Sequence, residues 1–474
     1  MRSHLRLLVI LFPLIVGSCS QKEQLFTLAD TQTSCSIVLD LGPYSTVQDA
    51  QNAYSSINWF DDKYKQDNIS QTALAALELQ EYLSHIFNIP KTHLPIIDAK
   101  NAPDTGNMII LGLPGESSLK QIIKPVKKYW RKSKSASDQA IRLDSFYGTT
   151  RRGMVLSGRT ATGNLYAVYE LLSRYGVRWF KPGADGEFVP RMKKIDIFSI
   201  HDFVDPEMKV RGYWMDARRE ANQGDIEFYK WLGRNRINLF WNNEKDVAAL
   251  KQRGILLNTG RKDLISTLIK PEYNYRYNHP NFPNDDHFPM DPFMVSDSFR
   301  GDSDDDQFLS YKEAHPEWFD TTSDSMHDGS ATIWVPHICL SKSDAVREFS
   351  QIIVDKLLYG EWQTCDIIDL WEPDYWCSCE KCQQMGNNAD KLLYMMYKIN
   401  QSIHFAKEAG TLKRPIYVHG YISHFAADPP SIKLPKDFNG QNMAVYLFTG
   451  PRCYNHYIIS PGCTAINIWF SRSI

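Results

Sequence analysis

The sequence predicts an α/β protein with an N-terminal α/β domain followed by a (β/α)8-type barrel. Two observations predict this fold class. Strand-like and helix-like apolar patterns alternate along most of the 474 residues, which is typical of α/β folds. The rhythm changes near Pro206, where loops become longer and strand–helix units begin to repeat. We therefore expect one domain over residues 35–200 and a second over residues 205–474.

The N-terminus has the order of regions found in a bacterial lipoprotein signal. A basic start, an apolar run over residues 7–16 and the small-residue sequence V-G-S-C end at Cys19. Residues 1–18 are predicted to be the signal, Cys19 the lipidation site and residues 19–34 a tether. We expect the protein to be exported and lipid-anchored to the outer membrane, on its periplasmic or cell-surface side. The alternative is an ordinary secretory signal that is cleaved near the same cysteine.

The first domain is predicted from two helices and several short strands. Helical spacing of apolar residues predicts helices over residues 71–87 and 162–175, the second ending at Gly176 as its C-cap. This segment has the alternation of a compact α/β accessory domain. Short apolar runs predict strands at residues 35–41, 94–97, 108–111, 141–143 and 153–157.

The second domain is predicted from repeated strand–helix units, which favour a parallel barrel over a doubly wound sheet. Helices are predicted at residues 226–232, 344–358 and 390–408, with a helical piece near 306–318 in an irregular stretch from about 260 to 335. Strands are predicted at residues 210–215, 237–241, 255–257, 337–340, 366–371, 415–421 and 443–448. Because these are seven strands and no eighth, we expect a TIM-like barrel that is truncated at its C-terminus.

Composition excludes some partners. The net charge of −2 offers no electrostatic attraction to nucleic acid or to an anionic membrane surface, so we expect membrane contact through the lipid only. No glycine-rich phosphate loop follows a predicted strand, which argues against a nucleotide site. The chain has 12 Trp and 24 Tyr, which suits a surface that stacks on sugar rings, although many of these rings will be core.

Carboxylates stand just past one predicted strand end, where barrels carry their chemistry. Glu372 and Asp374 flank Pro373, and residues two apart in extended chain lie about 6.5–7 Å apart. Carboxyl groups of inverting glycosidases lie roughly 6.5–9.5 Å apart, one protonating the leaving oxygen and one activating water. Glu372 and Asp374 are therefore the predicted catalytic pair, with Asp369 in reserve to orient a neighbour or raise its pKa. Capping of the following helix or binding to loop backbone is the alternative.

Other residues at the predicted strand ends could hold a sugar. Tryptophan faces stack on sugar rings, and Asp, Arg, Asn and His bind hydroxyl groups. Arg452 could bind a uronic carboxylate through two parallel hydrogen bonds. Structural roles, such as tryptophans that close the barrel and buried histidines that are already hydrogen-bonded, are the alternative. The predicted substrate-binding residues are Asp216, Arg218, Trp241, Asn242, His337, Trp371, His419 and Arg452.

The sequence WCSCEKC brings Cys377, Cys379 and Cys382 together. The C-x2-C spacing matches half of a zinc knuckle, and a fourth ligand would come from Cys339, Cys365 or a histidine. Exported proteins more often oxidise neighbouring cysteines, so disulfides are the alternative to structural zinc. In either case the cluster is expected to support the acidic loop, and the predicted reaction requires no cofactor.

Several segments resemble known carbohydrate-active families. LELQEYLSHIFNIPKTHLPII, MIILG and TGNLYAVYELLSRYGVRWFKPGADGEFVP resemble the accessory domain that precedes the barrel in family 67 α-glucuronidases and family 20 hexosaminidases. VRGYWMDARRE, HPEWF, HICLS, EPDYWCSCEKC and RCYNHYIISPGC resemble exported bacterial proteins with domain of unknown function 4838, which are regarded as glycoside-hydrolase-like. The resemblance runs from about residue 35 to the end. It implies a carbohydrate-active role, without a counterpart of the paired acids of either hydrolase family.

Together these observations predict a carbohydrate-active surface protein. The first hypothesis is a glycoside hydrolase that acts on a polysaccharide or glycan by carboxylate acid/base catalysis. The second is a non-catalytic glycan-binding lipoprotein on a hydrolase-like scaffold. Fold class does not separate the two, because barrels support many functions.

Overall fold

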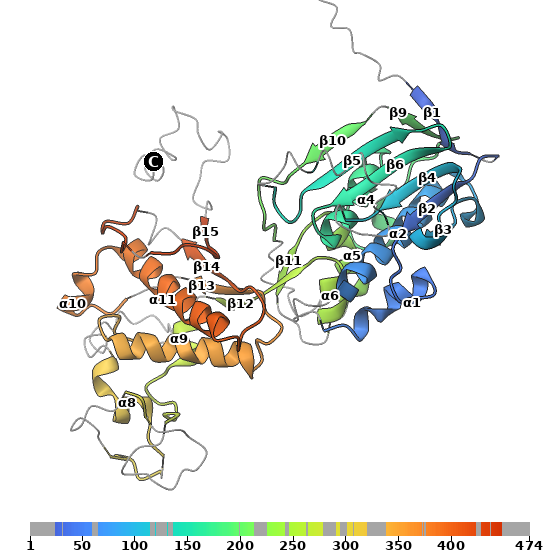
Figure 1. Cartoon of the computed structure of the whole chain (residues 1–474). Coiled ribbons are helices and arrows are strands. Elements are labelled where there is room, and N and C mark those ends of the chain that lie inside the picture. Colours follow the sequence, from blue (N-terminus) through green and yellow to red (C-terminus); the bar gives the residue numbers. More distant parts are fainter. Residues whose placement is uncertain are drawn as a thin grey trace, which may run out of the picture. The chain divides into compact units, whose positions relative to one another are not determined.

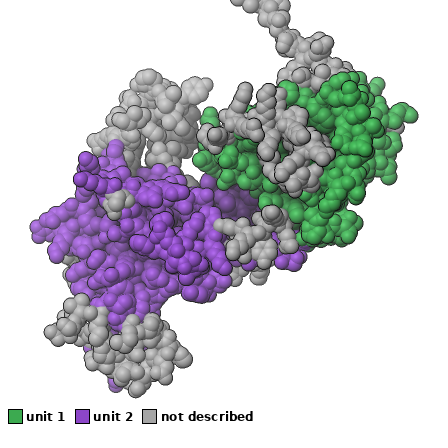
Figure 2. Space-filling view, in the orientation of Figure 1, with its two compact units in different colours: residues 1–52, 68–209 green, residues 53–67, 210–474 purple. Residues whose placement is uncertain are grey.

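The computed structural model divides the chain into two compact units (Figure 2). Unit 1 comprises residues 1–52 and 68–209, and unit 2 comprises residues 53–67 and 210–474. No helix in the described part of the chain is long and apolar enough to cross a membrane. The described residues are 24–30, 32–58, 65–113, 119, 130, 136–198, 200–212, 225–241, 246–261, 264–277, 291–293, 301–306, 308–319, 338–371, 373, 376–422, 428–436 and 438–447.

Unit 1 is built on a mixed six-stranded sheet with the strand order β10-β5-β6-β4-β2-β3 (Figure 1). The strands from β6 to β3 run parallel, whereas β5 and β10 are antiparallel to their neighbours. The five strands predicted from apolar runs in this domain are confirmed, with β3 shifted two residues later. The strands are β2 (Cys35–Leu39), β3 (Ile96–Asp98), β4 (Gly106–Leu111), β5 (Ile141–Tyr147), β6 (Arg151–Gly158) and β10 (His201–Val204).

Both helices predicted for the first domain are confirmed. Helix α2 (Lys65–Phe87) begins six residues earlier than its apolar pattern, because its first turn is polar. Helix α4 (Ala161–Arg174) is capped by the side chain of Thr160 and followed by Gly176 at φ +94°, which is the predicted C-cap conformation. Smaller elements are β1 (Gln24–Ala29), α1 (Val47–Asn52), β7 (Arg178–Trp179), β8 (Glu187–Phe188) and β9 (Ile195–Phe198).

Unit 2 contains a five-stranded sheet in the order β11-β12-β13-β14-β15, and every neighbouring pair is parallel. The parallel sheet confirms the α/β class. The described strands form an open sheet, so closure into a (β/α)8-type barrel is not confirmed. Of the predicted strand 210–215, the described part makes one bridge, from Gly212 to Leu239. The strands are β11 (Leu239–Trp241), β12 (Leu256–Arg261), β13 (Ile367–Trp371), β14 (Tyr417–Ile422) and β15 (Met443–Leu447).

Two long helices cover one face of this sheet. Helices α9 and α11 pack against each other, and α11 packs against β14 (Figure 1). Helix α11 starts with a capping box in which Asn387 and Asp390 each accept a hydrogen bond from the other's backbone. The helices of unit 2 are α5 (Ile226–Arg234), α6 (Val247–Gln252), α7 (Leu264–Leu268), α8 (Tyr311–Ala314), α9 (Ser343–Leu358), α10 (Glu380–Gln383) and α11 (Asn388–Glu408).

Two sequence predictions for this unit are wrong. The predicted strand 337–340 is a single bridge between Ile338 and Phe319, after which a hydrogen bond from Lys342 N to Cys339 O (3.0 Å) closes a turn. The predicted helix near 306–318 is limited to α8 and a short 3-10 turn that starts at Pro316. Proline lacks the amide hydrogen that would continue the α-helix.

Candidate functional site

The sheet of unit 2 has one apolar face that is covered by helices and a second face that carries polar side chains. Successive residues of a strand point to opposite faces. Ile368, Leu370 and Val418 belong to the apolar core that includes α9 and α11. Their strand neighbours Asp369 and His419, which are paired in register, therefore point to the other face.

Three polar side chains from neighbouring strands meet on that other face. The Asn258 amide on β12 donates a hydrogen bond to Asp369 Oδ2 on β13, and Asp369 Oδ1 lies 3.7 Å from His419 Nδ1 on β14. All three residues are at most 3% exposed. The predicted Asp369 and His419 thus lie together. The sequence analysis missed Asn258, whose only signal was its position directly after the predicted strand 255–257.

This burial sets the protonation of His419. Removal from water lowers the pKa of His419 to about 4, because burial disfavours the imidazolium ion. Asp369 is too buried for direct contact with a large substrate. Its position suits the predicted role of orienting a neighbouring residue.

We expect this histidine to make the protein less stable in acid. The unfolded chain takes up a proton near pH 6.5, whereas folded His419 does so only near pH 4. The contribution of His419 to the free energy of unfolding is therefore fully present above about pH 6.5. It is lost as the pH drops towards 4, and the loss is at most about 3 kcal/mol. Urea unfolding at pH 7.0, 5.5 and 4.5 measures this loss. His419→Gln should show a smaller loss over the same range, and equal losses in both proteins would contradict the assignment.

An aromatic pair lies farther along the same two strands. Trp371 on β13 and Tyr421 on β14 are paired in register and stack with ring centroids 4.4 Å apart and 22° between planes. Both residues are partly exposed. The pair therefore offers an aromatic surface at the carboxyl ends of β13 and β14, two residues beyond Asp369 and His419.

The predicted Trp241 does not extend this aromatic surface. Trp241 pairs with Asn258, and Asn258 pairs with Ile367, four residues before Trp371. Two strand spacings and four residues correspond to about 16 Å in a flat sheet. The register therefore separates Trp241 from the surface formed by Trp371 and Tyr421.

The other predicted site residues lie outside the described residues, including both members of the predicted acid pair. Pro373, between those two acids, is described and buried. The residues concerned are Cys19, Asp216, Arg218, Asn242, His337, Glu372, Asp374 and Arg452.

Four cysteines form a compact cluster. Cys339, Cys377, Cys379 and Cys382 have their sulfur atoms within 4.8 Å of one another. No disulfide joins the described cysteines. The Cys377 thiol hydrogen-bonds to Cys339 and lowers the pKa of Cys339 to about 4, while the same contact raises the pKa of Cys377. Cys339 was one of three fourth ligands that the sequence left open.

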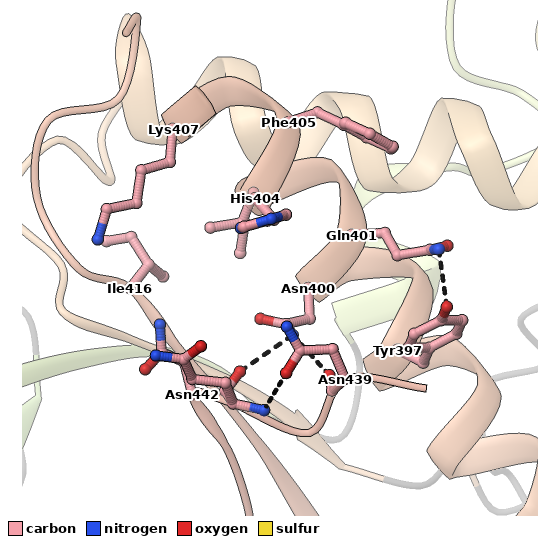
Figure 3. Close-up of a pocket in the computed structure, with 11 residues that line it drawn as sticks. Tyr397, Asn400, Gln401, His404, Phe405, Lys407, Ile416, Asn439 and Asn442 are labelled. Carbon is pink, nitrogen blue, oxygen red and sulfur yellow. Dashed lines mark hydrogen bonds between the residues drawn. The ribbon is translucent and has the colours of Figure 1, made fainter. Parts of the chain in front are cut away.

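A cavity of about 250 Å³ lies at the opposite edge of the sheet, beside the last turns of α11 and the amino ends of β14 and β15 (Figure 3). One polar residue of its lining, Asn400, has a structural role. The Asn400 amide donates to the backbone carbonyls of Asn439 and Gln441 and so fastens the segment before β15 to α11. Functional residues of parallel α/β folds gather at the carboxyl ends of strands, so we do not place the site in this cavity.

No family model matches the chain, and no curated protein matches it. Among solved structures, one titled "Structure of CpGH84D" is similar over 82% of this chain and 47% of that chain. The aligned residues are 10% identical and the TM-score is 0.34. The match thus spans about half of that chain.

Proposed function

We propose that the chain is a carbohydrate-active protein that holds a glycan at the carboxyl ends of β13 and β14. The observation that carries this proposal is the partly exposed stack of Trp371 on Tyr421, next to the buried group of Asp369, Asn258 and His419. Aromatic faces bind the weakly polar faces of sugar rings, and the exposed parts of Trp371 and Tyr421 offer such a surface. The resemblance to domain of unknown function 4838 proteins points to the same class.

We further propose that the activity is glycoside hydrolysis with Glu372 and Asp374 as the acid pair. Glu372 follows Trp371 directly in the sequence, and Asp374 follows it by three positions. Hydrolysis needs one carboxyl to protonate the leaving oxygen and another to activate water. In this proposal Asp369, on β13, is a positioning residue that orients a neighbouring residue. Export and a lipid anchor on Cys19 would place the protein where it meets polysaccharides.

Non-catalytic glycan binding is the second candidate. One observation favours it: Asp369, the described carboxylate on this face, is buried and already hydrogen-bonded to Asn258. A surface that binds through aromatic stacking needs no ionised acid. The two candidates share the same glycan surface and differ only in the role of Glu372 and Asp374.

A substrate screen with matched variants separates these candidates. Wild type, Glu372→Gln and Trp371→Ala are incubated with aryl-glycosides and with plant and host glycans, and both hydrolysis and binding are measured. We expect Glu372→Gln to lower the hydrolysis rate by about 10²–10⁴-fold with binding retained. Trp371→Ala should weaken binding by roughly tenfold, because it removes one stacking face.

Two variants serve as controls. Glu408→Gln changes a carboxylate at the end of α11, and Tyr359→Ala removes a ring that is 76% exposed after α9. Both should behave as wild type. Glycan binding without hydrolysis by wild type would favour the binding protein, and equal behaviour of Trp371→Ala and Tyr359→Ala would overturn the glycan surface itself.

A further inference from the structure

We infer that Cys339, Cys377, Cys379 and Cys382 together form a structural zinc site. Sulfur atoms at the corners of a tetrahedron around Zn²⁺, with Zn–S bonds of about 2.3 Å, lie about 3.8 Å apart. Cys339 Sγ lies 3.6 Å from the sulfur atoms of both Cys379 and Cys382. A disulfide would need roughly 2.05 Å, so these contacts have the spacing of shared metal ligands.

The surroundings of the sulfur atoms agree with a buried ion. Cys339, Cys377 and Cys382 are at most 4% exposed, and Cys379 is partly exposed. The Ser341 hydroxyl lies 3.1 Å from Cys339 Sγ and 3.9 Å from Cys379 Sγ, where it can donate to a thiolate. Buried thiolates repel one another unless a cation neutralises them, and four thiolates in tetrahedral order select zinc or iron.

The ligands come from two segments that are far apart in sequence. Cys339 lies in the turn before α9, and Cys339 N also donates to the carbonyl of Trp318. The other three cysteines lie around the start of α10, after β13. A closed set of four protein ligands leaves no position for a substrate, so the ion holds structure rather than taking part in catalysis. It would join the turn at 338–341 to the chain that leaves β13.

Zinc content tests this inference without any activity assay. The full chain is purified without added metal, and metals are measured by mass spectrometry. We expect one zinc per chain in wild type and less than about 0.1 in Cys339→Ser and Cys382→Ser. Cys365→Ser is the matched control, because Cys365 is equally buried in the same unit but outside the cluster, and it should keep its zinc.

A second measurement does not depend on the variants folding. Stripping wild type with a strong chelator should release one equivalent of zinc, expose the four cluster cysteines to alkylation and lower the melting temperature by at least about 5 °C. Iron in place of zinc would overturn the zinc assignment. Disulfides among the four cysteines, or their free alkylation in untreated protein, would overturn the site.

Discussion

Replacing Glu348 with alanine should lower the free energy of unfolding of unit 2 by about 3–5 kcal/mol. Glu348 lies on α9 and is completely buried. Its carboxylate accepts hydrogen bonds from the Arg276 guanidinium and from the hydroxyls of Tyr277 and Tyr311, each hydroxyl at 2.7 Å. Removal of the carboxylate leaves the two tyrosine hydroxyls without this acceptor in a region of low dielectric constant, and Arg276 keeps Asp355 as its carboxylate partner.

Both tyrosine hydroxyls act as donors to Glu348. Burial, reinforced by the negative charge of Glu348, raises the pKa of both Tyr277 and Tyr311 above the usual value for tyrosine. Their hydroxyls therefore stay protonated beyond the pH at which an exposed tyrosine ionises. The network fastens the segment around residues 275–277 and helix α8 to α9.

Hydrogen exchange along residues 343–358 and urea unfolding measure the effect. Asp344→Ala is the matched control, because it removes a carboxylate from the same helix whose pairing with Arg347 is exposed. An exposed pair contributes at most about 1 kcal/mol. If Glu348→Ala costs no more than Asp344→Ala, the buried network does not stabilise the fold as described.

Part of this network could be recognised in the sequence. Glu348 stands at helical spacing with Ala345 and Ile352, so the pattern places a carboxylate on the apolar side of the predicted helix 344–358. Its partner Arg276 is 72 residues away in the irregular stretch, and no periodicity connects the two. Sequence patterns thus indicate that a buried charge needs a partner, whereas only the fold identifies that partner.

In the candidate sites, too, the sequence indicated some of the residues, whereas only the fold identified their partners. Asp369 and His419 could be predicted, because polar residues near the carboxyl ends of strands are expected to be functional. Asn258 could not, since its role depends on the register of β12 with β13. Cys339 was one of several possible fourth ligands for the cluster. The turn that places it beside the other three cysteines lies where the sequence predicted a strand, at residues 337–340. Long apolar periods predict elements well, but contacts between distant segments depend on register and turns.

Gly260→Ala should destabilise the parallel sheet by at least about 3 kcal/mol and disturb the Asn258–Asp369 pair with it. Gly260 has φ +94°, and a Cβ built there lies 2.2 Å from the backbone oxygen of Asp369. That oxygen belongs to the neighbouring strand β13, so only a displacement of backbone relieves the clash. Since Asp369 carries both the Asn258 hydrogen bond and the contact to His419, a shift of β13 reaches the whole polar group.

Gly410→Ala separates the two causes of this loss. Gly410 also has a left-handed φ of +73°, but a Cβ there meets nothing within 4 Å. It should therefore cost only the conformational penalty of about 1–2 kcal/mol. The excess cost of Gly260→Ala over Gly410→Ala, measured by urea unfolding, reports the approach of β12 to β13. Equal costs would mean that the strands are not this close at Asp369, and the polar group on that face would lose its geometric basis.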